Sequence, residues 1–237
     1  MTDTRVDQIG DGIYRINTPV TVPGGDFEFS FNQYLIVDDQ PLLFHTGPKR
    51  LFPSVREALT RVVAPSKLRF IAFSHFESDE CGSLNPWLEL APEAEPVCGT
   101  INTMINADTF DRPPRTLVDG EVLVIGRHRL RWFDMPHLPH AWECGYLLEE
   151  ATRTLLCGDL FTQPGGGATA LTTSDDILPT SEAFRKQMDY FSHSRNTRAM
   201  IERLAAASPT TLACMHGSAY QGDGATLLRA LGAALDG

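Results

Sequence analysis

The chain has 237 residues, of which 42% are hydrophobic, and a formal net charge of −10. This length fits one large domain with a substantial core, and no charged or repetitive stretch indicates disorder. The negative charge excludes nonspecific binding to nucleic acid or to anionic membranes, which requires clustered Lys and Arg. One dense basic stretch, residues 127–131, is explained by an exposed strand face.

Neither the amino-terminal segment nor the cysteines indicate export. Residues 1–10 are polar, and the sequence has no run of about 18 apolar residues that would span a membrane. The five cysteines form no C-x-x-C pair, so we interpret them as reduced, buried thiols in a cytoplasmic protein. They are Cys81, Cys98, Cys144, Cys157 and Cys214.

The predicted elements of the first half are an opening meander followed by alternating helices and strands. Strands are predicted at residues 13–16, 33–37, 42–44, 68–73 and 97–98, and helices at 53–63, 83–90 and 101–107. Pro113 and Pro114 then end the helical pattern.

The second half returns to strands. We predict strands within residues 121–133, a hairpin of 146–148 and 154–157, two helices within 181–207, a strand at 210–214 and a closing helix at 223–235. Residues 163–180 are rich in Gly, Thr and Asp, which is typical of a mobile loop beside a site. Strands with helices, repeated twice, predict two stacked sheets with helices outside.

Metal-binding side chains follow four of these strands at the point where each strand ends. The candidates are His75, Glu77, Asp79 and Glu80 after the strand at 68–73, His140 after 130–133, Asp159 after 154–157, and His216 after 210–214. Residues two apart on a helix point to nearly opposite sides, so we expect residues 75–79 to lie on extended or loop backbone. Taken alone, that cluster is equally well explained as a solvated acidic loop with one incidental histidine.

Imidazoles and carboxylates together can hold two adjacent metal ions. A carboxylate-rich set favours iron or manganese, whereas an all-imidazole set favours zinc. His137 is an alternative to His140, and His45 is expected either to hydrogen-bond a ligand or to pack structurally. His128 and His193 lie in polar stretches, where we expect them to be exposed and without a role.

The order H-x-E-x-D, then His, then Gly-Asp, then His-Gly resembles the metallo-β-lactamase superfamily, specifically its flavodiiron and oxygen-binding di-iron branch. Hydrolases of that superfamily usually carry H-x-H-x-D-H, whereas Glu77 occupies the second position here, as in the di-iron branch. The resemblance extends from about Gly10 to the end of the chain. It implies one α/β domain over residues 1–237 with a four-layer αββα sandwich and the site at one edge.

The resemblance also implies a ligand set. His75, Glu77 and His140 would hold one metal, Asp79 and His216 the second, and Asp159 would bridge both. Glu80 stands where the family commonly has histidine, so it would ligate the second ion, bind it through water, or lie beside the ligands. The four negative charges of Glu77, Asp79, Glu80 and Asp159 would balance the charges of two divalent ions.

The implied activity is to bind, sense or reduce O2 or NO at two iron ions. Only 21 residues follow His216 (237 minus 216), so we expect no FMN on this chain and a separate reductase as electron donor. A homodimer is left open. One alternative is a dinuclear zinc hydrolase of an ester, lactone, thioester or phosphodiester, and another is a binding protein with a degenerate site.

Overall fold

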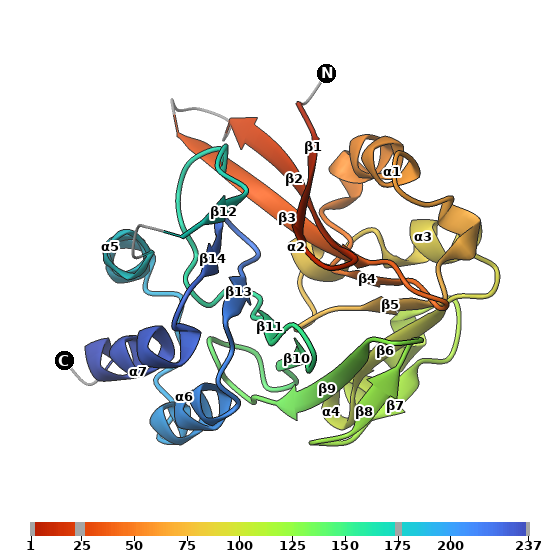
Figure 1. Cartoon of the computed structure of the whole chain (residues 1–237). Coiled ribbons are helices and arrows are strands. Elements are labelled where there is room, and N and C mark those ends of the chain that lie inside the picture. Colours follow the sequence, from red (N-terminus) through yellow and green to blue (C-terminus); the bar gives the residue numbers. More distant parts are fainter. Residues whose placement is uncertain (1–2, 22–26, 174–176, 236–237) are drawn as a thin grey trace.

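The computed structural model describes residues 3–21, 27–173 and 177–235. Two seven-stranded sheets lie face to face, and helices cover both outer faces (Figure 1). The predicted four-layer αββα sandwich is therefore confirmed.

The first sheet follows the chain in simple order. Its strands are β1 (Arg5–Gly10), β2 (Ile13–Thr21), β3 (Glu28–Ile36), β4 (Leu42–Phe44), β5 (Phe70–Ala72), β6 (Glu95–Gly99) and β7 (Arg115–Leu117). The strands β1 to β4 are antiparallel, whereas β4 to β7 are parallel. Because parallel neighbours need long crossovers, helices separate these strands along the chain. They are α1 (Phe52–Thr60), α2 (Ser78–Cys81), α3 (Leu84–Leu90) and α4 (Thr100–Asn106), with short 3-10 turns at Lys49–Leu51, Pro65–Lys67 and Ala107–Thr109.

The second sheet has the order β12-β14-β13-β11-β10-β9-β8. Its strands are β8 (Val122–Val124), β9 (Arg129–Asp134), β10 (Gly145–Glu149), β11 (Thr154–Leu156), β12 (Leu171–Thr172), β13 (Thr211–Ala213) and β14 (Ala219–Gln221). Its helices are α5 (Leu178–Met188), α6 (Thr197–Ala206) and α7 (Gly224–Ala234). Asp223 caps α7 by accepting a hydrogen bond from Thr226 N at 2.9 Å.

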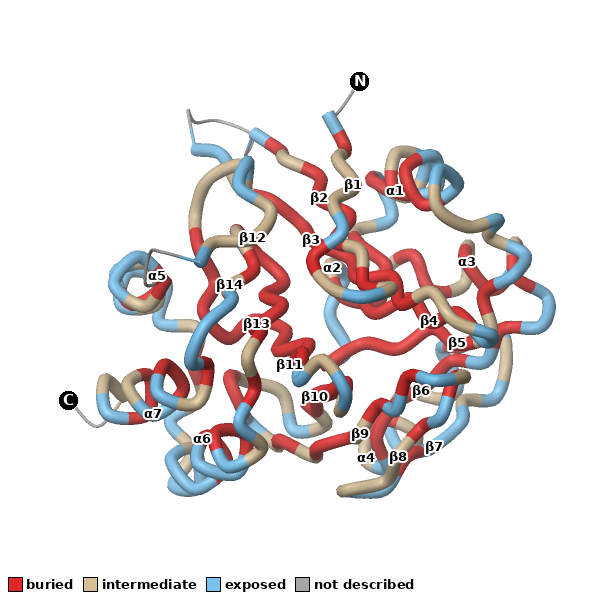
Figure 2. The backbone as a smooth tube through the Cα atoms, in the orientation of Figure 1, coloured by how far each residue is buried: buried red, intermediate tan, exposed pale blue. Residues whose placement is uncertain are grey.

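Three apolar layers hold the sandwich together. Tyr34, Trp132 and Leu147 belong to the layer between the sheets. A second layer joins Val55 and Trp87, on α1 and α3, to the first sheet, and a third joins the second sheet to α6 and α7. Buried backbone accordingly runs through both sheets, while the outer turns of the helices are exposed (Figure 2). Burial of these side chains contributes about 25 cal/mol for each Å² of apolar surface.

Several details differ from the predictions. The strands β1, β7, β12 and β14 were not predicted because they are short or polar, and α1 ends at Thr60 rather than at residue 63. The segment predicted as a mobile loop, 163–180, includes β12 and the start of α5, and residues 174–176 lie outside the described part.

The prediction that His128 is exposed is wrong. This residue is 3% exposed, and its Nδ1 lies 3.2 Å from Glu149 Oε1, whose side chain is also buried. Adjacent Arg127 and Arg129 are exposed, as expected for the basic stretch. The polar residues around His128 in the sequence therefore gave no sign that its side chain points inward to Glu149.

All five cysteines are free and buried, in agreement with their interpretation as apolar thiols. Cys81 Sγ donates to Glu77 O at 3.2 Å, and Cys157 Sγ lies 3.9 Å from Cys214 Sγ. Within the described ranges, no helix combines the length and the hydrophobicity needed to cross a membrane.

Candidate metal centre

The segment that carries His75 changes from loop to helix. It leaves the sheet after β5, and α2 begins at Ser78, so His75 and Glu77 lie on non-helical backbone as predicted. Asp79 lies with Glu80 in the single turn of α2, so the expectation of extended or loop backbone is wrong for Asp79. Because the helix begins only after Glu77, helical geometry does not force His75, Glu77 and Asp79 to opposite sides.

A buried chain of polar groups holds the His75 ring. His75 Nδ1 lies 2.9 Å from Ser74 Oγ, which in turn lies 3.0 Å from His45 Nε2. All three side chains are buried. His45 is thus connected to His75 through one hydroxyl, and the Nε2 atom of His75 is left facing the other candidate ligands.

His140 is held by the backbone of a distant segment. Its Nδ1 lies 2.9 Å from Tyr190 O, and because a carbonyl only accepts, Nδ1 carries the proton. Its Nε2 lies 3.0 Å from His75 Nε2. His137 is exposed instead, so the structure brings His140, and not His137, to this cluster.

His216 is held in the same way. Its Nδ1 donates to Ser30 O on β3 at 2.8 Å, which leaves Nε2 free. Phe29 stacks on the imidazole with ring centroids 4.3 Å apart, and Phe31 contacts it edge-on at 5.4 Å. The ring is therefore fixed both by a hydrogen bond and by packing.

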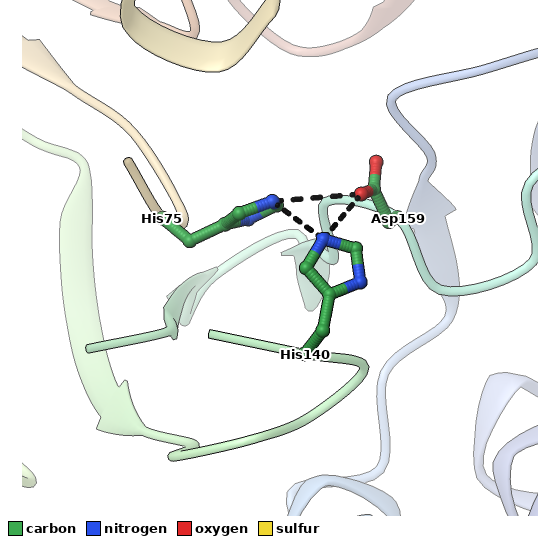
Figure 3. Close-up of side chains that lie close together, drawn as sticks. All are labelled: His75, His140 and Asp159. Carbon is green, nitrogen blue, oxygen red and sulfur yellow. Dashed lines mark hydrogen bonds and ion pairs between the residues drawn. The ribbon is translucent and has the colours of Figure 1, made fainter. Parts of the chain in front are cut away.

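Asp159 lies between the three free nitrogens. Its Oδ2 is 3.6 Å from His75 Nε2 and 3.6 Å from His140 Nε2, while its Oδ1 is 3.2 Å from His216 Nε2. Figure 3 shows His75, His140 and Asp159 pointing toward one another. The two oxygens of one carboxylate thus face two different sets of histidines.

The remaining acidic candidates divide between these sets. Glu77 Oε1 lies 3.1 Å from His140 Nε2, and Asp79 Oδ2 lies 3.6 Å from His216 Nε2. Glu80 Oε2 lies 3.9 Å from His75 Nε2. Three groups have donor atoms within 4.8 Å of one another: His75 with His140 and Asp159, His75 with Glu77 and Glu80, and Asp79 with Glu80 and His216.

Three buried carboxylate oxygens of this cluster have no hydrogen-bond donor among the described residues. Both carboxylate oxygens of Glu80 and the Oδ1 of Asp159 are buried and accept no hydrogen bond from the described residues. A buried carboxylate without a partner is costly, whereas a bound cation would satisfy it. The residues present therefore fit metal ions.

The pKa shifts reflect the same crowding of charge. Burial raises the pKa of Glu80 well above its usual range, and the nearby Asp159 carboxylate adds to this rise. Burial opposes ionisation of Asp159 as well, but His216, His75 and His140 outweigh it and lower the pKa of that carboxyl. Hydrogen bonds from His140 and His75 lower the pKa of Glu77 from 4.5 to about 2.

The three imidazoles show the opposite shift. Burial alone would lower the pKa of His75, but Glu80 and other neighbours raise it well above its ordinary value. The pKa values of His140 and His216 are also raised, since Glu77 and Asp159 respectively outweigh the effect of burial. In the absence of metal, protons therefore partly compensate these carboxylates.

A cavity of about 410 Å³ opens beside Glu77. Phe76, Phe110 and Leu84 form part of its apolar wall, and Lys49 lies at its edge. The Glu77 side chain is 49% exposed, whereas those of His75 and Glu80 are 0% exposed. A small ligand would therefore reach the cluster most directly from the Glu77 side.

Sequence reasoning missed the residues that hold the ligands' backbones. Asn32 Nδ2 donates to Cys214 O at 2.9 Å and to Gly217 O at 2.8 Å. Tyr34 Oη also donates to Cys214 O, at 2.7 Å. Polar residues that alternate within an otherwise apolar strand are the one signal that would have indicated them.

The profile described as ODP family beta lactamase matches residues 29–217, which include every candidate ligand. The chain belongs to this family. This match confirms that the chain resembles the di-iron branch of the metallo-β-lactamase superfamily, as its motifs indicated.

Relatives of this ODP-family chain are longer proteins. The rubredoxin-oxygen oxidoreductase of Megalodesulfovibrio gigas is 22% identical over 205 residues, which are 81% of this chain and 50% of that protein. A nitric oxide reductase of Moorella thermoacetica is 33% identical over 139 residues, 56% of this chain and 34% of that protein. The chain thus spans at most about half the length of these two relatives.

Solved structures share the fold of the ODP-family chain. A mutant of the flavo di-iron protein from Thermotoga maritima superimposes with a TM-score of 0.85 at 18% identity. The match covers 96% of this chain and 61% of that one. The likeness establishes the arrangement of the two sheets and their helices.

Proposed function

We propose that this chain is a di-iron protein that binds, senses or reduces O2 or NO with electrons from an external donor. One observation carries the proposal: Asp159 directs one oxygen toward His216 and the other toward His75 and His140. A carboxylate placed in this way is suited to bridge two adjacent metal ions.

The proposed ligands form two sets around Asp159. His75, Glu77 and His140 would hold one ion, and Asp79 and His216 the other. Each set presents imidazole Nε2 atoms and carboxylate oxygens. Glu80 is buried, and its carboxylate lies within 4.8 Å of donor atoms of both His75 and Asp79. It is proposed as a further ligand of the second ion, directly or through water. Its two oxygens accept no hydrogen bond from any described residue, which supports this role.

Ligand chemistry and the relatives favour iron. Three imidazoles and four carboxylates form a harder ligand set than the imidazole-rich sets typical of zinc. Manganese has similar preferences and is the second choice. The related proteins are named for oxygen, nitric oxide and di-iron chemistry rather than for hydrolysis. The hydrolase alternative is accordingly disfavoured.

Two ferrous ions, when bound, would supply electrons and open positions for a diatomic ligand. The chain's own contribution is to fix the ligands and control access. Carbonyls of Tyr190 and Ser30 fix the tautomers of His140 and His216. Phe29 and Phe31 shield His216 from water, and the cavity beside Glu77 admits small molecules.

An external donor is proposed because reduction needs a renewable source of electrons. The related oxidoreductase is named for rubredoxin, a separate electron carrier. We propose a separate reductase or carrier protein for this chain as well, without FMN bound to the residues described above.

Anaerobic purification followed by metal analysis tests the function. We expect about two iron ions per chain, a visible absorption band that changes on exposure to oxygen, and consumption of O2 or NO when a chemical reductant is supplied. Stoichiometric zinc together with turnover of model esters would establish the hydrolase instead. Fewer than one metal per chain after reconstitution would indicate a degenerate site.

A further inference from the structure

One arginine joins the two loops that follow Asp159 and His216. Arg15, on β2, is 0% exposed, and its Nη2 donates to Gly167 O and to Gly217 O, both at 2.7 Å. Gly217 directly follows His216, and Gly167 lies on the segment that continues from Asp159. A single nitrogen thus connects the chain segments of two proposed ligands.

The burial of this guanidinium is energetically unfavourable. Its Nε and Nη1 make no hydrogen bond with the described residues. The Asp7 carboxylate lies 3.8 Å from Nη1, and its side chain is 38% exposed. A buried cation with such weak compensation costs folding free energy, so a purely structural position would favour an apolar side chain.

The loop after His216 is held at several further points. Gly217 O also accepts from Asn32 Nδ2 at 2.8 Å, and Gly217 N donates to Ser30 Oγ at 3.1 Å. His216 Nδ1 donates to the carbonyl of the same Ser30. Hydrogen bonds to β3 therefore hold both the His216 ring and the backbone next to it. Arg15 adds a connection to the loop that carries Gly167.

The Gly167 segment packs directly on the guanidinium. The φ of Gly167 is +60°, and a Cβ atom on this residue would lie 2.6 Å from Arg15 Nη2 and 2.8 Å from Ser30 Oγ. Only glycine fits this close approach without displacing its neighbours. The contact therefore requires both the glycine at position 167 and the arginine at position 15.

We propose that Arg15 is a positioning residue of the metal centre, which fixes the approach of His216 to Asp159 by holding Gly167 and Gly217 together. This inference rests on the proposed function, because it assumes that both residues bind metal. His75, Glu77 and His140 are held by other segments, so the ion shared by Asp79, Asp159 and His216 should depend most on Arg15.

The test uses the full chain, stripped with a chelator and reconstituted anaerobically with ferrous iron. Arg15→Met removes the charge and the donors, and Arg15→Lys retains a charged donor. Arg112→Met is the matched control, since Arg112 donates to the carbonyls of Leu88, Ala91 and Ala94 in another part of the fold. Iron per chain is measured after gel filtration, and melting temperatures are recorded with and without iron.

We expect two ions per chain in the wild type and in Arg112→Met, about one in Arg15→Met, and an intermediate number in Arg15→Lys. Without iron, Arg112→Met should melt at lower temperature because it loses three hydrogen bonds. The melting temperature of metal-free Arg15→Met should change less, because removal of the poorly compensated buried charge offsets the loss of its hydrogen bonds. Iron should raise the melting temperature of Arg112→Met as it does that of the wild type, but that of Arg15→Met less. A purely structural role would not produce this difference.

If Arg15→Met retains two ions with dissociation constants within twofold of the wild type, the inference is wrong and the proposed function stands. If that variant does not fold, Arg15→Lys carries the test, because the shorter ammonium side chain cannot reproduce both hydrogen bonds of the guanidinium and should bind fewer than two ions. Retention of both ions by a folded Arg15→Lys, with dissociation constants within twofold of the wild type, would then overturn the inference. Fewer than two ions in the wild type would overturn the proposed function and this inference with it.

Discussion

Asp159 and His216 face each other with Oδ1 and Nε2 3.2 Å apart, although 57 residues separate them in the chain (216 minus 159). The other oxygen of Asp159 faces His75 and His140. One carboxylate is therefore common to both halves of the proposed centre.

Replacing Asp159 should affect both ions. We expect Asp159→Ala to bind less than one metal per chain, because the proposed bridging carboxylate would serve both positions. His137→Ala should keep both ions, since His137 is exposed and away from the cluster. Elemental analysis after reconstitution measures this, and equal loss in both variants would contradict the assignment.

Glu77→His tests whether carboxylate ligands make the proposed site prefer iron over zinc. The substitution replaces a carboxylate by an imidazole at a half-exposed ligand position, so it should raise the ratio of zinc to iron bound in a competition between the two metals. The ratio is measured by elemental analysis after equilibration with equal concentrations. An unchanged ratio would count against iron selection by the carboxylates.

Glu80→Gln should change stability and metal affinity in opposite directions. The buried Glu80 carboxyl has a raised pKa, so at neutral pH it destabilises the metal-free fold, and its removal should add about 1 to 3 kcal/mol to the free energy of unfolding. Metal affinity should fall by about tenfold or more.

Chemical denaturation and chelator competition measure these two effects of Glu80→Gln. Glu89→Gln, at an exposed position on α3, serves as the control and should change neither quantity. A loss of stability in metal-free Glu80→Gln would show that its carboxylate is already satisfied without a metal ion.

Metal affinity should increase with pH beyond the ordinary imidazole range. The pKa of His75 is raised well above 6.5, and metal binds neutral imidazole, so binding must release protons at pH 7. In the metal-free protein the sign is reversed: the stability from protonated His75 is fully present below pH 6.5 and is lost as pH rises through the folded-state pKa.

Calorimetry in buffers of different ionisation enthalpy counts the protons released on metal binding. Unfolding of the chelated protein, followed from the ordinary His pKa of about 6.5 upward, measures the change in stability over this pH window. Stability of the chelated protein that rises over this window would contradict the predicted direction.

Gly217→Ala should be more harmful than Gly120→Ala. Both glycines have positive φ, +85° and +81°, but a Cβ at Gly217 would lie 2.5 Å from Gln163 Cβ, whereas nothing lies within 4 Å of one at Gly120. Gly120→Ala should cost about 1 to 2 kcal/mol for backbone strain alone, and Gly217→Ala clearly more. Urea denaturation compares them, and equal losses would mean that the Gln163 contact relaxes freely.

Much of the fold was predictable because its signals are local. The buried strand at 70–72 and the hairpin of β10 and β11 appear as apolar runs bounded by turn residues, and Asp223 marks the start of α7. The candidate ligands were recognisable because each follows such a strand. The structure brings all of them into one cluster, and their role as ligands stays a prediction.

The rest depends on contacts between distant segments, which no local pattern encodes. Arg15 lies in a predicted strand, and no local pattern indicates that loops from the other end of the chain cover it. His128 is buried beside Glu149 on β10, with its Nδ1 3.2 Å from Glu149 Oε1. The helical turn that carries Asp79 is too short for a periodic pattern to show.

The division of the cluster between the two sheets has a consequence for biogenesis. His75 and the adjoining acidic residues follow the first sheet, whereas His140, Asp159 and His216 follow strands of the second. During translation, the nascent protein cannot complete the second half of the cage until β13 and His216 have left the ribosome. Iron loading of the proposed centre would therefore follow synthesis of the second sheet, and a polypeptide released before that point would not hold iron in a finished centre.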